Sequence, residues 1–164
     1  FYFFSVISMF KQVNLPAVEA HSHVTLHYRL TVLDDILSDF LNTFDGNPAT
    51  VAIGQAQLAP FMEKCLMGLT EGAHEVFDLT ASEAFGEYNS DLCQEVGRAL
   101  LLEGNPQVDD FAKGDFVDFA MPNGYRMTGM FQGWNNQKSG AWVDFNHPLA
   151  GKPLRLELKV IGVL

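Results

Sequence analysis

The sequence predicts an α+β fold that is mainly β, with an antiparallel sheet wrapped on one short helix and a small β-rich module inserted in it. Apolar and polar residues alternate from Val24 to Val32, which is the period of a strand with one buried face. Apolar residues recur at helical spacing from Leu58 to Leu66, and the long stretch between residues 86 and 143 has an apolar pattern of its own. The 164 residues suffice for one ordinary domain or for two small ones that share a boundary.

The composition is that of a folded, acidic protein. The chain is 48% hydrophobic and 18% charged, and its 20 acidic and 10 basic residues give a formal net charge of -10. A phosphate-binding surface needs clustered Lys and Arg, so we expect no direct nucleic-acid partner. Cys65 and Cys93 form neither a Cys-x-x-Cys pair nor half of a zinc site, and we interpret both as thiols in a reducing compartment. This interpretation favours a cytoplasmic location.

The amino-terminal segment Phe1–Phe10 is apolar, yet it has only about half of the roughly 20 residues that cross a bilayer. We therefore expect no membrane span there. The segment also lacks a basic start and a small-residue cleavage site, which disfavours a secretory signal. Because the chain starts without Met and Met9 precedes a more ordinary sequence, we expect an upstream extension or a misassigned start. Residues 1–22 are accordingly expected to form an amino-terminal extension.

Three histidines near the start of the first strand could suggest a metal site. They are His21, His23 and His27. The sequence offers no fourth ligand beside them, so a solvated strand edge is the favoured interpretation and no metal is predicted.

The first part of the chain is expected to form a small antiparallel domain. Asp34-Asp35 marks a turn after the first strand, and Ile36-Leu37 starts a return strand. A short strand from Thr50 to Ile53 is closed by Gly54. These short strands surround the amphipathic helix that follows.

The helix is predicted from one apolar face and from the residues at its ends. The face consists of Leu58, Met62 and Leu66. Pro60 fits the first turn and Gly68 fits the C-terminal end. A turn over residues 70–72 then leads into a strand from Glu75 to Leu79. A sheet wrapped on this one helix is the simplest packing.

The long stretch before Val143 is expected to fold separately, because structureless loops of this length are uncommon inside compact domains. Pro122-Asn123-Gly124 lies between two apolar runs and predicts a hairpin, and Trp134-Asn135-Asn136 begins another turn. The apolar positions of the runs are Val117, Phe119, Tyr125, Met127, Gly129, Phe131 and Trp142.

Five motifs occur in an order that is typical of one known family. Tyr28 and Asp39 come first, followed by the helix block Gly54–Gly72, an Ala-Phe-Gly loop at Ala84-Phe85-Gly86, and the sequence Asn-His-Pro-Leu-Ala-Gly at 146–151. Any one of these motifs is weak evidence by itself. Together they resemble bacterial FKBP-type prolyl isomerases that carry an insert-in-flap domain, the SlyD and SlpA group.

The resemblance covers nearly everything from Val24 to Leu164. It implies an FKBP-like isomerase domain over residues 23–90 and 139–164, interrupted by an insert-in-flap chaperone domain over residues 91–138. It further implies a peptidyl-prolyl cis-trans isomerase that twists X-Pro amides in an apolar pocket and needs no cofactor. The expected partners are unfolded or nascent polypeptides that contain proline.

By resemblance, residues from most of these motifs would form the pocket. They are Tyr28, Asp39, Leu58, Ala59, Met62, Phe85 and Leu156, with His147 and Leu149 near the mouth. Tyr28 and Leu156 would be walls around the proline ring, together with Leu58 and Phe85. Asp39 would orient the substrate, and the N–H of Ala59 would hold a substrate carbonyl. Tyr28 and Leu156 could instead be core residues, and Asp39 could merely cap a turn.

The insert contains more apolar residues than such a small module easily hides. We expect a substrate-binding surface formed by Leu92, Val96, Leu100, Leu101, Met127, Met130 and Phe131. Flexible methionines allow such a surface to repack around many apolar sequences. The alternative is that most of these side chains form the core of the insert. Because Phe1–Phe10 resembles the peptides that the surface should bind, this segment of the same chain or of another copy is a further expected partner.

Several positions depart from the family pattern and favour weak catalysis. Active members often carry a large apolar residue where Ala59 stands, a glycine at Phe61 and a phenylalanine at Leu156, and many have Tyr in place of Phe85. SlpA-type members share some of these reductions, so the chain looks closer to SlpA than to SlyD. Two functions therefore stay open. One is an isomerase and folding chaperone, and the other is a holdase or assembly factor that binds apolar segments through the insert.

Overall fold

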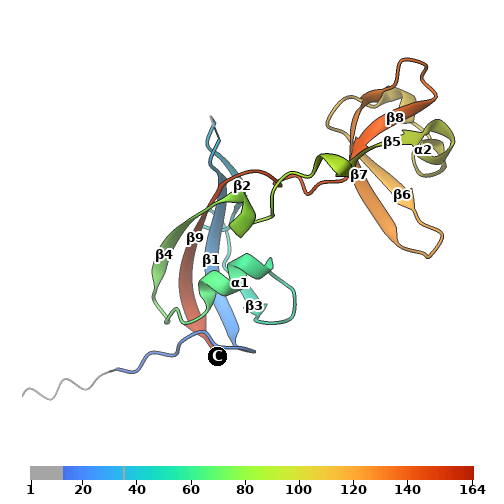
Figure 1. Cartoon of the computed structure of the whole chain (residues 1–164). Helices are drawn as coiled ribbons and strands as arrows, with labels where there is room; N and C mark the ends of the chain where they lie inside the picture. Colours follow the sequence, from blue (N-terminus) through green and yellow to red (C-terminus); the bar gives the residue numbers. More distant parts are fainter. Residues whose placement is uncertain (1–12, 35) are drawn as a thin grey trace, which may run out of the picture. The chain divides into compact units, whose positions relative to one another are not determined.

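The computed structural model describes residues 13–34 and 36–164, which form two compact units (Figure 1). The first unit runs to Thr80 and resumes at Pro153, and the second comprises Ala81–Lys152. The second unit is thus inserted in the sequence of the first. The expectations for Phe1–Phe10 and for Asp35 lie outside the described residues.

The first unit is built on an antiparallel sheet. Its strands are β1 (His23–Val32), β2 (Ser38–Asn42), β3 (Ala49–Ala52), β4 (His74–Leu79) and β9 (Leu154–Val163). Their order is β2-β1-β9-β4, and β3 pairs with the start of β1. The predicted alternation is confirmed, since Val24, Leu26 and Leu30 are fully buried while Thr25 and Arg29 between them are partly exposed. The predicted fold class, mainly β and antiparallel, is confirmed as well.

The helix α1 (Pro60–Leu66) confirms the predicted short helix. Pro60 occupies its first turn, where the missing N–H would have no partner in any case. Gly68 follows its end with a φ of 80°, a conformation that glycine adopts without strain. Met62 and Leu66 are buried, and Leu66 is wholly inaccessible to solvent. This face of α1 therefore packs on the apolar face of the sheet.

The segment before β1 takes part in the first unit. Val18 is buried, its N–H donates to the Leu69 carbonyl at 2.8 Å, and its own carbonyl accepts from Gly68 at 2.9 Å. Ala17 bridges Thr70 in the same way. Residues 16–18 of the expected extension are thus part of the fold. Three residues are too few to show a periodic pattern, which is why the sequence gives no sign of them.

The second strand begins later than expected. The prediction starts it at Ile36-Leu37, whereas β2 starts at Ser38, because Ser38 pairs with Val32 at the end of β1 and the residues between them form the turn. Phe40 faces no residue of β1, so the pairing contains a β-bulge.

The second unit contains a four-stranded antiparallel sheet and one α-helix. Its elements are β5 (Cys93–Gly97), α2 (Arg98–Gly104), β6 (Phe116–Ala120), β7 (Arg126–Trp134) and β8 (Gly140–Asp144), with short 3-10 helices at Ala81–Glu83, Ser90–Leu92 and Val108–Asp110. The strand order is β5-β8-β7-β6. The predicted hairpin is confirmed, since Pro122-Asn123-Gly124 joins β6 to β7. The predicted turn after Trp134 joins β7 to β8.

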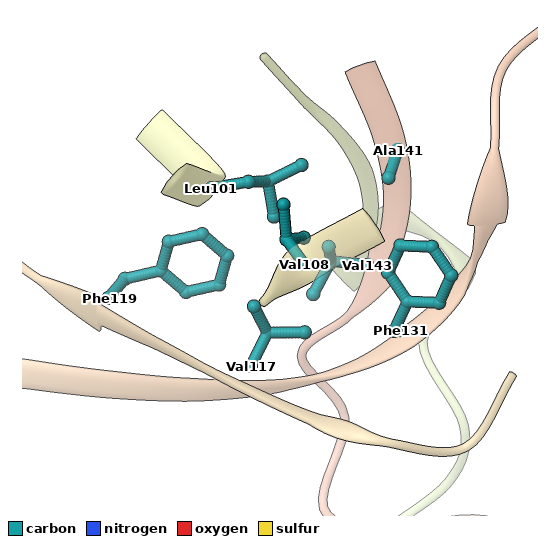
Figure 2. Close-up of a cluster of buried hydrophobic side chains, with 7 residues drawn as sticks. All are labelled: Leu101, Val108, Val117, Phe119, Phe131, Ala141 and Val143. Atoms are coloured by element: carbon teal, nitrogen blue, oxygen red, sulfur yellow. The ribbon is translucent and has the colours of Figure 1, made fainter. Parts of the chain in front are cut away.

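Figure 2 shows the core of the second unit, where side chains from α2 and from the strands converge. The buried residues are Leu101, Val108, Val117, Phe119, Phe131, Ala141 and Val143. Gly129 of β7 lies close to this core, and a Cβ at that position would come 2.3 Å from Val143 Cγ1. Glycine is therefore the residue that lets β7 approach the neighbouring side chain.

Strand pairing places the boundary of the inserted unit differently from the predicted one. The sequence predicts that the isomerase domain resumes at residue 139, but β8 lies between β5 and β7 in the second sheet. Residues 81–90, also expected in the isomerase domain, belong to the second unit. The physical reason for the first difference is that β8 supplies the buried Ala141 and Val143 to the core of the second unit.

Candidate functional site

Two residues of the predicted pocket lie on the apolar face of the first sheet. Tyr28 of β1 pairs with Leu158 of β9, and Leu30 pairs with Leu156. Tyr28 and Leu156 are therefore diagonal neighbours on one face. Leu156 is fully buried, so it is a core residue, whereas Tyr28 is partly exposed. Of these two residues, only Tyr28 is accessible to a ligand.

Three further pocket residues lie at the start of α1. Leu58 and Ala59 are partly exposed, and Met62 is buried. The Ala59 carbonyl accepts hydrogen bonds from the N–H groups of Met62 and Glu63 at 2.9 and 3.2 Å. Within the described part of the chain, the N–H of Ala59 has no acceptor. Gly54 N–H donates to Glu63 Oε1 at 3.2 Å, which fixes the preceding loop to the helix. The Ala59 N–H is thus available to an outside acceptor.

Asp39, the expected polar orienter, lies on the other face of the sheet. It pairs with Thr31, whose hydroxyl donates to Asp39 Oδ1 at 2.8 Å. Arg29 Nε lies 3.8 Å from Asp39 Oδ2. Because Arg29 and Thr31 alternate with Tyr28 along β1, the structure does not bring Asp39 to the face of Tyr28. The bulge at Phe40 accounts for this placement, since one extra residue reverses the alternation of a strand.

The face that carries Asp39 contains a charged depression of about 580 Å³, here called the outer groove. Its lining consists of Arg29, Thr31, Leu37, Asp39, Val76, Arg155 and Glu157. Arg29 Nη1 lies 3.7 Å from Glu157 Oε2, and Arg29 Cζ lies 5.2 Å from the centre of the Phe44 ring. Its Nε is buried and has no hydrogen-bond partner among the described residues. Four of the seven lining residues are charged, so the outer groove differs from the apolar pocket that the family resemblance implies.

In the second unit, Phe85 and His147 form an aromatic pair. The ring centroids are 4.0 Å apart and the ring planes differ by 6°. Leu149 is buried, and its N–H donates to His147 Nδ1 at 3.1 Å. Partial burial of the imidazole lowers the pKa of His147 below its ordinary value of 6.5. The stacked ring is therefore neutral near pH 7, with its proton on Nε2.

The two segments that carry this aromatic pair are joined by hydrogen bonds. Gly151 N–H donates to the Gly86 carbonyl at 2.8 Å. The Asn146 carboxamide donates to the Asn89 carbonyl at 2.8 Å and accepts from the Asn89 N–H at 3.0 Å. The structure thus brings the Ala-Phe-Gly loop and the Asn-His-Pro-Leu-Ala-Gly segment together.

The lowered pKa of His147 predicts a pH dependence of stability. The unfolded chain binds a proton at this residue more readily than the folded chain, so stability is lost as the pH falls below 6.5 and through the folded pKa. We expect the melting temperature of the wild-type protein to fall more steeply between about pH 7 and about pH 5 than that of His147→Phe. Thermal melts across this range measure the difference. Parallel curves for the two proteins would contradict the expectation.

The residues predicted to bind substrate in the insert divide between its core and its surface. Leu101 and Phe131 are 0% and 2% exposed, so they belong to the core, as the alternative interpretation of these residues has it. The exposed residues are Leu92, Leu100 and Met127, and the partly buried ones are Val96 and Met130. A bound chain could reach only the exposed and partly buried residues.

Some of these residues line a second depression of about 280 Å³, here called the apolar groove. Its lining consists of Gln94, Glu95, Val96, Gly97, Leu100, Phe119, Met121, Met127 and Phe145. Met121 and Met127 flank the turn between β6 and β7, and Leu100 comes from α2. Val96 of β5 is among the residues predicted for this surface, whereas Phe145 and the other β5 residues that line the groove, Gln94, Glu95 and Gly97, are not. The long apolar pattern was the only signal that could have pointed to such a surface.

Within residues 13–34 and 36–164, no helix is both long and apolar enough to cross a membrane. The same residues hold no group of three or more His, Cys, Asp or Glu side chains placed to bind a metal ion. Neither Cys65 nor Cys93 takes part in a disulfide.

Comparison with known proteins identifies relatives over most of the chain, although no family model matches. The chain is 31% identical over 148 residues to the FKBP-type 16 kDa peptidyl-prolyl cis-trans isomerase of Escherichia coli, covering 90% of this chain and 94% of the relative. It is 30% identical over 143 residues to a probable protein of the same name from Pseudomonas fluorescens, covering 87% and 89%. It is 31% identical over 126 residues to the FKBP-type peptidyl-prolyl cis-trans isomerase SlyD of Helicobacter pylori, covering 76% and 64%.

Proposed function

This chain belongs to the family of FKBP-type peptidyl-prolyl cis-trans isomerases, and on that premise we propose that it isomerises X-Pro bonds in unfolded or nascent polypeptides. The observation that carries the proposal is the 31% identity to the Escherichia coli relative over 94% of that protein. The order of the family motifs, from Tyr28 to the segment 146–151, also supports the proposal.

The proposed reaction is rotation about an amide bond. Its barrier is about 18–20 kcal/mol because resonance makes the C–N bond partly double, and the uncatalysed step takes tens of seconds or longer. Since no bond forms between protein and substrate, the reaction needs no nucleophile, metal or cofactor. A dry apolar pocket favours the twisted amide, whose carbonyl oxygen carries less charge than that of the planar form. Lowering the barrier by about 4 kcal/mol accelerates the reaction on the order of a thousandfold.

In the first unit, we assign contact with the proline ring to Tyr28 and Leu58, both of which are partly exposed. The buried Leu156 supports Tyr28 from the same face of the sheet. The N–H of Ala59 holds a substrate carbonyl, and its lack of an acceptor within the described residues supports this role. Asp39 has no part in the assignment because its carboxylate lies in the outer groove.

In the second unit, we assign substrate contact to Phe85. Its side chain is partly exposed in a loop between an alanine and a glycine, so it has less reason than a strand residue to serve the core. The phenyl ring offers an apolar surface without a hydroxyl. It therefore acts by excluding water from the rotating amide rather than by donating a hydrogen bond.

We further propose that the apolar groove captures unfolded segments. Leu100 and Met127 line it and are 46% and 41% exposed, although each is apolar. Methionine adapts to many apolar partners, which suits a surface that meets varied sequences. Segment Phe1–Phe10, from this chain or from another copy, is one candidate occupant because it is itself apolar.

Met127→Glu is expected to abolish capture, because it places a charge in the apolar groove and a charge is costly to desolvate. Suppression of the aggregation of reduced insulin, followed by light scattering, measures capture. Met67→Glu is the matched control, since Met67 is 45% exposed on the first unit. Undiminished suppression by Met127→Glu would contradict the role of the apolar groove.

A second candidate function is a holdase that captures chains without isomerising them. Ala59 and Phe61, which depart from the family pattern, favour this function. The apolar groove is complete within the second unit, so capture does not depend on catalysis. The two functions are separated by assaying a tetrapeptide that is too short to need capture. An isomerase accelerates its X-Pro rotation, and a holdase does not.

The proposal includes a reducing, cytoplasmic setting for this activity. Cys65 and Cys93 support it, since neither forms a disulfide.

A further inference from the structure

We infer that His147 is a positioning residue, which holds the ring of Phe85 in place by parallel stacking. The inference rests on the proposed function, because it concerns the residue that contacts the substrate. His147 itself touches Phe85 and need not touch the substrate.

The geometry of the pair supports this role. With the centroids 4.0 Å apart and the planes 6° from parallel, the imidazole covers one face of the phenyl ring. Phe85 lies in a loop, where a phenylalanine side chain would otherwise exchange between rotamers. An aromatic neighbour on one face restricts that exchange. The opposite face and the edge of the phenyl ring can then meet the substrate in one fixed orientation.

His147 is itself held by its own loop. Leu149 N–H donates to Nδ1 at 3.1 Å, and Ala150 N–H donates to the His147 carbonyl at 2.9 Å. Leu149 is 4% exposed, so it anchors the loop in the second unit. The contact from Nδ1 to the N–H two residues later is the one that an Asn side chain makes in an Asx-turn. The imidazole therefore has two separable contacts, one through its edge and one through its face.

Hydrogen bonds on both sides of the aromatic pair keep the two segments in register. The bond from Gly151 to Gly86 lies next to Phe85 in sequence, and the Asn146–Asn89 pair lies next to His147. The position of the imidazole relative to the phenyl ring is thus fixed by hydrogen bonds between the two segments as well as by stacking. Such support is what a substrate-contacting side chain needs if it is to stay in the productive geometry.

The test separates the two contacts of the imidazole. His147→Asn keeps an acceptor for the Leu149 N–H and removes the ring, whereas His147→Phe keeps a flat ring and removes the acceptor. His147→Leu keeps apolar bulk without a flat face. His21→Asn is the control, because His21 is exposed and its φ of 71° suits asparagine.

We expect His147→Asn and His147→Leu to lower kcat/KM for a proline tetrapeptide by about two- to tenfold, the range that an aromatic pair contributes. The kcat/KM of His147→Phe is expected to lie within about twofold of the wild-type value. The kcat/KM of His21→Asn is expected to equal that of the wild type. The NMR signals of the Phe85 ring protons shift in the Asn and Leu variants, because the ring current of the imidazole is lost.

Two results would overturn the inference. One is full activity in His147→Leu together with shifted Phe85 signals, and the other is an equal loss in His147→Phe and His147→Asn. If His147→Asn fails to fold, the comparison of kcat/KM between His147→Leu and His147→Phe tests the inference instead. A wild-type protein without activity would refute the proposed function instead. In that case unchanged Phe85 signals in His147→Leu would still overturn the stacking.

Discussion

Phe85→Ala is expected to lower kcat/KM for a proline tetrapeptide by on the order of ten- to a hundredfold, the equivalent of about 1.5–3 kcal/mol of buried apolar surface. The change removes the phenyl ring that we propose contacts the substrate. A protease-free assay of cis-to-trans relaxation measures the effect. Suppression of insulin aggregation is expected to persist, because the apolar groove does not include Phe85.

Two further variants control this experiment. Phe85→Tyr keeps the ring and supplies the hydroxyl common in the family, so it is expected to match or exceed the wild type. Phe116→Ala removes a phenylalanine that is 61% exposed on β6 and is expected to leave tetrapeptide catalysis unchanged. Equal activity of Phe85→Ala and the wild type would show that Phe85 has no part in catalysis.

Phe131→Ala is expected to destabilise the second unit by about 3–5 kcal/mol, because it leaves a cavity in a closely packed core. Phe131 is 2% exposed, and its ring meets those of Phe111 and Trp134 edge to face. Both tryptophans of the chain, Trp134 and Trp142, lie in the second unit. Their fluorescence during urea unfolding therefore reports on this unit specifically.

The control for Phe131→Ala is again Phe116→Ala, which truncates the same side chain at an exposed position of the same unit. Its expected loss is below about 1 kcal/mol. Capture of reduced insulin is expected to fail in Phe131→Ala at urea concentrations that the control tolerates. A loss of similar size in both variants would mean that Phe131 does not hold the core together.

Elements whose burial is regular could be predicted from the sequence. The alternation from Val24 to Val32 follows directly from one buried and one exposed strand face. Pro60 and Gly68 bound α1 because each suits one end of a helix and disrupts its middle. The hairpin at Pro122-Asn123-Gly124 was predictable because its glycine has a φ of 83° that few other residues tolerate.

Elements that are short or half exposed could not be predicted. Strand β5 has five residues, of which only Val96 packs against the core of the second unit. Helix α2 contains three consecutive leucines, and only Leu101 among them is buried. A run of identical residues does not reveal which one faces the core. The helical period of α2 therefore cannot be recognised in the sequence.

For the candidate site, the sequence predicts the residues of each local motif but not the contacts between motifs. The pairing of Phe85 with His147 joins two motifs that the sequence places 62 residues apart, and it depends on hydrogen bonds that no spacing shows. Asp39 lies on the outer face because of one bulged residue, Phe40, which leaves no mark in the composition of β2. Arg29 of the outer groove appeared only as one polar position in an alternating strand.

The most direct test of the isomerase activity is the cis-to-trans relaxation rate of an Ala-Leu-Pro-Phe peptide with and without this protein. The same protein is then added to the refolding of a protein whose slow phase is limited by proline isomerisation. An isomerase with a capture surface accelerates both, and accelerates refolding more. A peptide rate and a refolding rate that are both unchanged by the protein would contradict the proposed activity.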